Sequence, residues 1–233
     1  MLREIDLLDV YDSSECNLIE DLMIPCISNS VSYIRGVGFF SSGWLRLAAK
    51  GIVQLIANGG KASFIVSPQL ENSDWEAMKL GNAAKESPEL LSILSRNIEE
   101  LRNNLEDDTK NTLAWLIADE MLEFHFAIPR NRDSQCDYHD KVGLCIDNEQ
   151  NRVAFHGSFN DSIKGSLNGE AFSVFRSWND GQLAYVDQHE NRLRQLLCNE
   201  NTQFEVFGIP DAIKNDFMGW PGLFGQKRGL NKL

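Results

Sequence analysis

The sequence predicts an α/β fold in which a mixed β-sheet is covered by helices on both faces. Residues 31–66 follow a strand, helix and strand pattern in close succession, which is typical of a βαβ unit with parallel strands and a right-handed crossover. Five more short apolar segments follow residue 121, separated by turns and helical stretches, and we expect them to extend the same sheet.

In the first part of the chain, the apolar pattern changes between the helical and the strand period. The expected elements are a helix over 14–28, a strand over 31–40, a helix over 44–57 and a strand over 61–66. Asn58-Gly59-Gly60 supplies the end of the second helix, and Pro68 stops the strand that follows. A helical segment over about 73–121 comes next, and we interpret it as a solvated layer because residues 86–124 hold ten acidic and three basic residues.

The later part of the chain is richer in strands. The expected elements are strands over 122–128, 137–146, 152–156, 171–178 and 203–207, with a short helix over 161–167 and a longer one over 182–198. No repeat, low-complexity tract or linker interrupts this pattern, so we expect a single domain over residues 1–220. Residues 221–233 are basic and contain glycine, which indicates a flexible tail or a linker to something larger.

Composition and charge limit the classes of function. The 233 residues carry a net charge of −12, which argues against wholesale wrapping of nucleic acid. Most of this acidity lies outside residues 125–178, which hold seven acidic and six basic residues. Five cysteines without regular spacing indicate reduced structural thiols and no zinc site. Since the chain has no apolar run that would span a bilayer and no secretory signal, we expect a soluble cytoplasmic protein.

One pair of polar residues suits phosphodiester chemistry. His139 and Lys141 lie two positions apart in an expected strand, so their side chains are expected to leave the same face. A neutral imidazole can attack phosphorus while an ammonium group neutralises a non-bridging oxygen. The spacing therefore favours His139 as a nucleophile and Lys141 as a phosphate ligand.

Two later segments can complete such a site. Gly157-Ser158-Phe159-Asn160 follows an expected strand and precedes a short helix, where backbone N–H groups, the Ser158 hydroxyl and the Asn160 carboxamide can face an anion. Glu170 can accept a hydrogen bond from the second ring nitrogen of a histidine and fix its tautomer. We expect Glu170 to orient the nucleophile rather than to attack.

The segments YHDKVGLCID, VAFHGSFNDS and GEAFSVFRSW together resemble the phospholipase D superfamily, in particular its nuclease-like branch. That branch occurs in free-standing restriction-type nucleases and at the N-terminus of superfamily 2 helicases in phage-defence systems. The stretch VGFFSSGWLRLAAKGIVQLIANGGKASFIVSPQL is similar to the opening half of those domains, so the resemblance covers nearly the whole chain. It implies a phospholipase D-like sheet with helices on both faces.

The resemblance also implies a metal-independent phosphodiesterase without a cofactor, working through a phosphohistidine intermediate. Family members need two H-x-K motifs, and this chain has one. We therefore expect a homodimer in which the two His139 residues meet at a two-fold axis. The family pattern usually places an Asp five residues after the Lys, where this chain has Ile146 followed by Asp147, so the role of that Asp is in doubt here.

Several nearby residues have a functional and a structural interpretation. Lys164 and Arg176 are the nearest cations after the motif, and each suits either a contact with a phosphate backbone or a solvated surface position. His156 abuts the Gly-Ser turn and can either line the site or belong to the strand surface, whereas His189 is expected on the surface of a polar helix. The glycines of 36–38 form no nucleotide fingerprint and are expected to permit close backbone packing.

Two classes of function follow. The first hypothesis is a homodimeric DNA endonuclease of a prokaryotic anti-phage defence system. The alternative is a DNA-binding or assembly module of a helicase-containing defence complex, with weak or no nuclease activity of its own, and the acidity of the chain favours it. A lipid phosphodiesterase is less well supported, because no interfacial amphipathic helix with a basic face is predicted.

Overall fold

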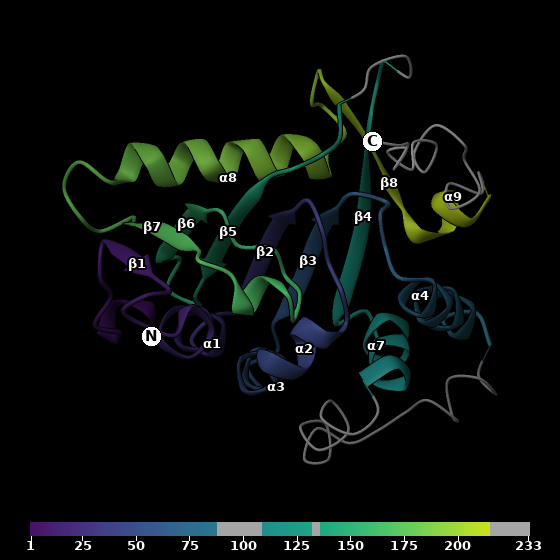
Figure 1. The fold of residues 1–233 in the computed structure, drawn as a ribbon, viewed down its shortest axis with the longest axis horizontal. Coiled ribbons are helices and arrows are strands. Elements are labelled where there is room, and N and C mark those ends of the chain that lie inside the picture. Colours follow the sequence, from purple (N-terminus) through teal and green to yellow (C-terminus); the bar gives the residue numbers. More distant parts are fainter. Residues whose placement is uncertain (88–108, 132–135, 215–233) are drawn as a thin grey trace, which may run out of the picture.

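The computed structural model describes residues 1–87, 109–131 and 136–214, and within these ranges the chain forms one eight-stranded β-sheet (Figure 1). The strands are β1 (Val10–Asp12), β2 (Ser32–Val37), β3 (Lys61–Val66), β4 (Leu122–Pro129), β5 (Lys141–Ile146), β6 (Arg152–Gly157), β7 (Ala171–Arg176) and β8 (Phe204–Gly208). Their order across the sheet is β1-β7-β6-β5-β2-β3-β4-β8. β2, β3 and β4 pair in parallel and the other neighbours pair antiparallel, so the expected mixed sheet is confirmed.

Helices cover both faces of this sheet (Figure 1). α8 (Leu183–Leu197) lies across one face, where it contacts β2, β5, β6 and β7. The other face carries α1 (Ile24–Ser28), α2 (Gly43–Leu47), α3 (Ala49–Ala57) and α7 (Thr109–Ala118). The remaining helical elements are η1 (Leu2–Glu4), the π-helix η2 (Leu18–Met23), α4 (Asn72–Ala84), the 3-10 helix η3 (Gly165–Leu167) and α9 (Ile209–Lys214). The arrangement confirms the expected α/β class with helices on both faces.

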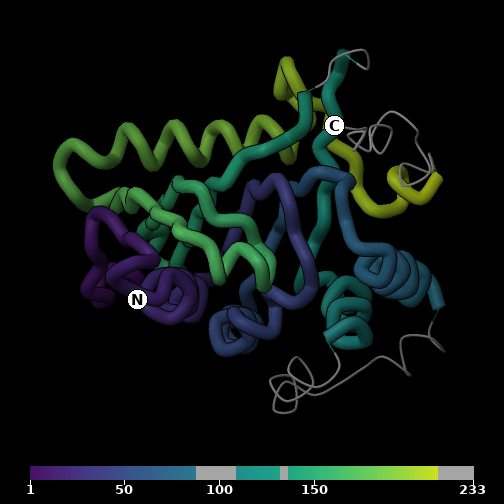
Figure 2. The backbone as a smooth tube through the Cα atoms, viewed as in Figure 1, coloured from purple at the N-terminus to yellow at the C-terminus, as the bar shows by residue number. Residues whose placement is uncertain are grey.

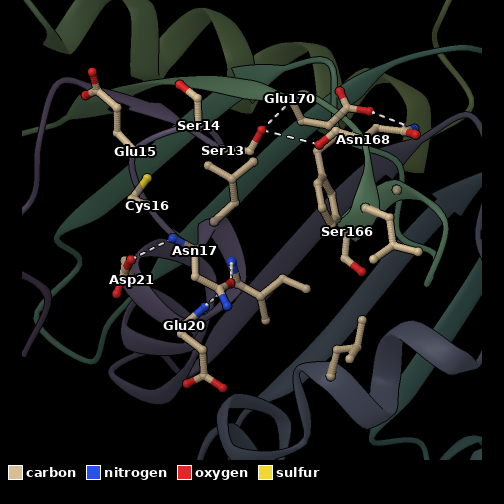
Figure 3. Close-up of a pocket in the computed structure, with 16 residues that line it drawn as sticks. Ser13, Ser14, Glu15, Cys16, Asn17, Glu20, Asp21, Ser166, Asn168 and Glu170 are labelled. Atoms are coloured by element: carbon tan, nitrogen blue, oxygen red, sulfur yellow. Dashed lines mark hydrogen bonds between the residues drawn. The ribbon is translucent and has the colours of Figure 1, made fainter.

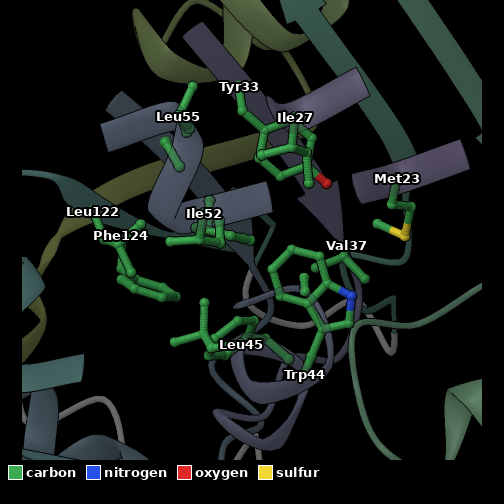
Figure 4. Close-up of a cluster of buried hydrophobic side chains, with 14 of the residues drawn as sticks. Met23, Ile27, Tyr33, Val37, Trp44, Leu45, Ile52, Leu55, Leu122 and Phe124 are labelled. Carbon is green, nitrogen blue, oxygen red and sulfur yellow. The ribbon is translucent and has the colours of Figure 1, made fainter. Parts of the chain in front are cut away.

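Each face of the sheet has its own hydrophobic core. The larger core lies under α1 to α3 and is rich in aromatic rings, with Tyr33 and Trp44 stacked at 6.4 Å between ring centroids (Figure 4). The smaller core lies under α8 and includes Val142 and Leu144 of β5. Because successive side chains of a strand point to opposite faces, Lys141 lies on the face of the larger core.

The N-terminal segment lies against the later part of the sheet, far from it in sequence (Figure 2). β1 pairs with β7 through Val10↔Ser173 and its neighbours. The pairing continues beyond β1, where the Ser13 N–H donates to the Glu170 carbonyl over 2.9 Å. The sequence did not predict this edge strand, since three residues are too few to show a period-2 pattern.

Several observed elements differ from the expected ones. The helix expected over 14–28 starts at Leu18 and consists of the π-helix η2 followed by α1. The helix expected over 44–57 is divided at Ala48 into α2 and α3. Of the strand expected over 137–146, only the part from Lys141 onward is regular strand. The short helix expected over 161–167 is reduced to η3. Part of the acidic helical segment and the whole basic tail over 221–233 lie outside the described residues. In the described ranges, no helix has both the length and the apolarity that crossing a bilayer requires.

Candidate active site

The predicted catalytic residues lie at one edge of the sheet, where β2 and β6 end and β5 and β7 begin. β2 ends at Val37, which is paired with Lys141 at the start of β5. β6 ends at Gly157, which is paired with Phe172 near the start of β7. The loops before β5, after β6 and before β7 therefore meet at this edge, because antiparallel neighbours bring the end of one strand beside the start of the next.

Lys141 is the first residue of β5 and is only 8% exposed. Its Nζ donates to the His139 carbonyl over 3.4 Å, and none of the carboxylates in the described ranges forms an ion pair with it. Burial lowers the pKa of Lys141, as does the positive charge of Arg35, while Glu170, Asp140 and Asp161 oppose this effect. A buried ammonium group without a paired carboxylate can accept an anionic ligand.

His139 lies just outside β5 and its side chain is exposed. His139 and Lys141 were expected to leave the same face of one strand. Residues 136–140 have no regular secondary structure, so this argument does not hold for His139. Gly38 makes room for this approach, since a Cβ there would lie 2.7 Å from His139 Nδ1 and 3.0 Å from His139 Cα. The Gly38 N–H donates to the Asp140 carbonyl over 2.9 Å, which fixes the backbone next to His139. The expected close backbone packing is thus confirmed at Gly38, whereas the atoms nearest a Cβ at Gly36 belong to side chains.

Asp140 fixes the same segment from the other face of the sheet. Its carboxylate accepts from Nε and Nη2 of Arg192 on α8, both at 2.7 Å. This two-point contact is the geometry that arginine and carboxylate prefer. The main chain that carries His139 is therefore anchored by β2 on one side and by α8 on the other.

The Gly157-Ser158-Phe159-Asn160 segment forms a tight turn against the start of β7. A Cβ at Gly157 would collide with the Ala171 carbonyl, at 1.8 Å, so only glycine fits there. The exposed Ser158 accepts from the Ala171 N–H through Oγ over 3.3 Å, which leaves its own hydroxyl hydrogen free to donate. Oδ1 of Asn160 is buried without a hydrogen-bond partner in the described part of the chain. Both side chains retain hydrogen-bonding capacity for a ligand.

Beneath this turn lies an ion pair that the sequence analysis did not single out. Arg35 of β2 and Asp161 are both fully buried, and Nη2 of Arg35 lies 2.7 Å from Oδ1 of Asp161. Arg35 also donates to the Phe159 carbonyl over 2.9 Å. Burial is the largest effect and would lower the pKa of Arg35, but the charge and hydrogen bonds of Asp161, together with Tyr33 and Tyr138, outweigh it and the pKa is raised. Two features of the sequence could have indicated this ion pair. They are an arginine within an apolar strand and an Asp directly after the G-S-x-N motif.

Glu170 is half-buried and is held by the N-terminal segment. Its N–H donates to Ser13 Oγ over 2.8 Å, and its carboxylate accepts from Asn168 Nδ2 over 3.3 Å. No hydrogen bond joins Glu170 to His139 within the described chain, so its orienting role stays a prediction. The negative charge of Glu170 nevertheless acts on Lys141, because it raises the pKa of the Lys141 amine.

A pocket of about 830 Å³ opens beside Glu170 (Figure 3). It is lined by residues 13–21 of the N-terminal segment and by Gly165–Asn168 of the loop before β7, and it includes the acidic side chains of Glu15, Glu20 and Asp21. His139 and Lys141 do not line it. In residues 1–87, 109–131 and 136–214, no group of three or more His, Cys, Asp or Glu side chains is placed to hold a metal ion.

The two cations named as candidate phosphate ligands are placed differently. Lys164 is exposed on the loop after the G-S-x-N turn and has no ion pair within the described chain. Arg176 lies at the far end of β7, where its side chain is 13% exposed and bonded to Asp9 and to the Leu7 carbonyl. Its pairing with Val153, near the start of β6, separates it from the site edge. The structure thus gives Arg176 a structural role and leaves Lys164 available to a ligand.

His156 and His189 face α8 rather than the Lys141 side of the sheet. His156 is paired with Val142, whose side chain belongs to the core under α8. The His156 and His189 rings lie 5.4 Å apart. His189 was expected on the surface, but it is half-buried against Phe175, so that prediction is wrong. Burial lowers the pKa of His189, and the neighbouring His156 and Arg192 lower it further.

Asp147 has a structural role in this chain. It is buried, and its carboxylate accepts from the N–H groups of Leu2, Glu149 and Asn151 at 2.9 to 3.1 Å. These bonds and its contact with the Asn151 side chain lower the pKa of Asp147 against the effect of burial. The residue closes the β5–β6 turn at the end of the sheet opposite the site.

Comparison with known proteins gives matches at the level of structure. No protein-family model and no curated protein sequence matches the chain. A solved structure of Nuc from Salmonella typhimurium, a phospholipase D family member, is similar with a TM-score of 0.42 and 15% identity over 80% of this chain and 93% of its own. NucT from Helicobacter pylori is similar with a TM-score of 0.41 and 13% identity over 79% of this chain and 94% of its own.

Proposed function

We propose that this chain is a phosphodiesterase that cleaves DNA through a phosphohistidine intermediate, without a divalent metal, at an active site shared by two copies. The observation that carries the proposal is the buried Lys141 amine, which has no carboxylate partner in the described ranges and lies beside the exposed His139. Keeping a buried ammonium group unpaired is unfavourable for folding, so its retention favours a role in binding an anion.

In the proposed reaction, one ring nitrogen of His139 attacks phosphorus and the bond from phosphorus to the leaving oxygen breaks. The leaving oxygen takes a proton from His139 of the partner subunit. Water then attacks the phosphohistidine, gives its proton to the same partner residue and releases the phosphate end. Lys141, Ser158 and Asn160 hold the non-bridging oxygens, with the Gly157 turn beneath them, and Glu170 orients an imidazole.

Dimerisation is part of this mechanism, because the sequence holds one H-x-K motif and each chain then supplies one histidine. An isologous interface would place two identical His139 side chains on either side of the scissile phosphate. The resemblance of the motifs to the nuclease-like branch suggests a role in prokaryotic anti-phage defence, with a helicase as a possible partner.

The first test is cleavage of a labelled DNA duplex and single strand in the presence of EDTA. We expect cleavage by the wild type, none by His139→Ala, and wild-type activity for the control His125→Gln, whose histidine lies on β4 outside this edge. A strict requirement for added magnesium would contradict the mechanism.

A mixed dimer tests the shared site. We expect a dimer of one wild-type and one His139→Ala subunit, isolated through two different tags, to be inactive, since only one histidine remains. Half of the wild-type activity in that mixed dimer would mean that each chain holds a complete site.

The acidity of the chain supports a second candidate function, a DNA-binding or assembly module in a helicase-containing complex. Under this alternative, the purified protein would not cleave DNA in any buffer but would bind a protein partner. The salt dependence of DNA binding separates the two, because phosphate contacts give a steep negative slope of log affinity against log salt.

A further inference from the structure

A second pocket lies near the G-S-x-N turn and shares no lining residue with the acidic pocket of Figure 3. It has a volume of about 340 Å³ and is lined by Ser41, Ser42, Arg46, Lys110, Glu71 and Ile163, among others. The Ser41 N–H donates to the Asp161 carbonyl over 2.9 Å, and Ile163 packs on Gly43 so closely that a Cβ there would lie 2.7 Å from Ile163 Cδ1. The wall of this pocket is therefore continuous with the loop that carries Ser158 and Asn160.

Two serine hydroxyls at this pocket have no hydrogen-bond partner within the described ranges. Ser41 and Ser42 are 6% and 7% exposed, and their hydroxyl groups line the pocket without a hydrogen bond to any described residue. Their backbone N–H groups are already used, by the Asp161 carbonyl and by Asp74 Oδ2 at 2.9 Å. Neither Oγ is among the fully buried side-chain atoms without a partner, so both hydroxyls remain open to the pocket and can donate to a ligand that accepts hydrogen bonds.

Two cations at the same pocket have no ion-pair partner among the described residues. Arg46 and Lys110 are exposed and form no ion pair with any residue the structure describes. Elsewhere the same protein pairs its cations with carboxylates, as in Arg152 with Glu190 and Arg192 with Asp140. In a chain of net charge −12, two cations without an ion-pair partner in the described ranges, beside the edge that carries Lys141, can attract an anionic ligand.

We infer that this pocket is a second phosphate subsite, which binds a backbone phosphate of the nucleic-acid strand next to the scissile one. The inference deepens the proposed function and rests on it for the position of the scissile phosphate. Arg46 and Lys110 supply the charge, and the hydroxyls of Ser41 and Ser42 donate to the non-bridging oxygens. The carboxylates of the acidic pocket repel a phosphate backbone, whereas Arg46 attracts it, so the DNA strand leaves the active site toward Arg46.

The pocket also holds negative charge, so the inference predicts opposite effects on DNA binding for the removal of a carboxylate and the removal of a cation. Glu71 lies at its rim, and the fully buried Asp74 lies behind Ser42. A phosphate at this position is therefore repelled by Glu71. Replacing Glu71 by Gln is expected to strengthen DNA binding, the reverse of the result for the two cations.

The experiment is a DNA-binding titration of the full chain by fluorescence anisotropy, in the His139→Ala background so that DNA is not cut. At 0.1 M salt, Arg46→Ala and Lys110→Ala are each expected to lower the affinity for a labelled oligonucleotide about fivefold to tenfold. Each is also expected to make the slope of log affinity against log salt less negative, by about 0.7 on a single strand or about 0.9 on a duplex. The matched control is Lys61→Ala, an exposed lysine at the start of β3, at the opposite edge of the sheet, which is expected to change neither value.

A second measurement separates the subsite from general damage to the active site. In the otherwise wild-type chain, Arg46→Ala is expected to lower oligonucleotide cleavage more than cleavage of bis(4-nitrophenyl) phosphate, which has a single phosphodiester. An unchanged ratio of the two activities, or DNA binding equal to that of Lys61→Ala, would overturn the subsite. In a third outcome, the wild type does not cut DNA, while the Arg46 and Lys110 variants still show the expected loss of DNA affinity and of salt dependence. That result would support the subsite and contradict the proposed nuclease activity.

Discussion

Arg35 and Asp161, 126 residues apart in sequence, form a buried ion pair in which Nε and Nη2 of the guanidinium both bond to the carboxylate at 2.7 to 3.2 Å. The pair joins β2 to the residue directly after Asn160. Rings of Phe155 and Phe172 lie 5.6 Å from the guanidinium carbon and exclude water from it. The position of the G-S-x-N turn relative to β2 therefore depends on a charge–charge contact in the core.

The first prediction concerns this pair. Asp161→Leu leaves the guanidinium buried without its partner and is expected to lower the free energy of unfolding by about 3–5 kcal/mol, and Arg35→Met is expected to act similarly. The double variant Arg35→Met/Asp161→Leu should lose clearly less than the sum of the two, as measured by urea unfolding. Additive losses would mean that the contact makes no specific contribution.

The second prediction separates stability from activity at Lys141. Lys141→Met replaces a buried amine by a side chain of similar length without charge, so we expect an unfolding free energy equal to or above that of the wild type. DNA cleavage should fall below detection. Thermal or urea unfolding and a cleavage assay on the same preparation check both parts, and a large loss of stability would show that the amine has a structural partner.

The third prediction concerns the space beside His139. Gly38→Ala places a methyl group against Nδ1 and Cα of His139, so the imidazole must move and cleavage is expected to fall about tenfold or more. The control is Gly208→Ala on β8, where the nearest atom to a Cβ, Pro210 Cδ, lies 3.6 Å away. Equal activity in the two variants would show that the position of His139 tolerates the added methyl group.

The fourth prediction is a pH dependence of stability. The pKa of His189 is lowered by burial and then by His156 and Arg192, so the folded protein resists protonation of this ring. An unfolded histidine takes up its proton near pH 6.5, and stability is therefore lost as the pH falls from about 7 through the folded pKa. His189→Phe should show a smaller decrease between pH 8 and pH 5 in urea unfolding, whereas parallel decreases in both proteins would contradict the assignment.

Most of the secondary structure could be predicted from the sequence because apolar periodicity records which face of an element is buried. β3 was expected over 61–66 and is observed over those residues, and its parallel pairing with β2 follows from the short crossover between them. The H-x-K and G-S-x-N residues could be named as a phosphate site because their chemistry is local to two short segments. The three-residue β1 and the division of the helix at Ala48 carry no such periodic signal.

What the sequence determined by itself is therefore the class of fold and the identity of the polar groups at the candidate site. Only the tertiary structure decided how these groups are supported: which face each histidine takes, that Arg176 is bonded to Asp9 away from the site, and that Arg35 and Asp161 lie beneath the turn. The reason is physical. Strand and helix patterns depend on neighbours a few residues away, whereas an ion pair or a pocket wall joins residues that the chain brings together only when the whole sheet has formed.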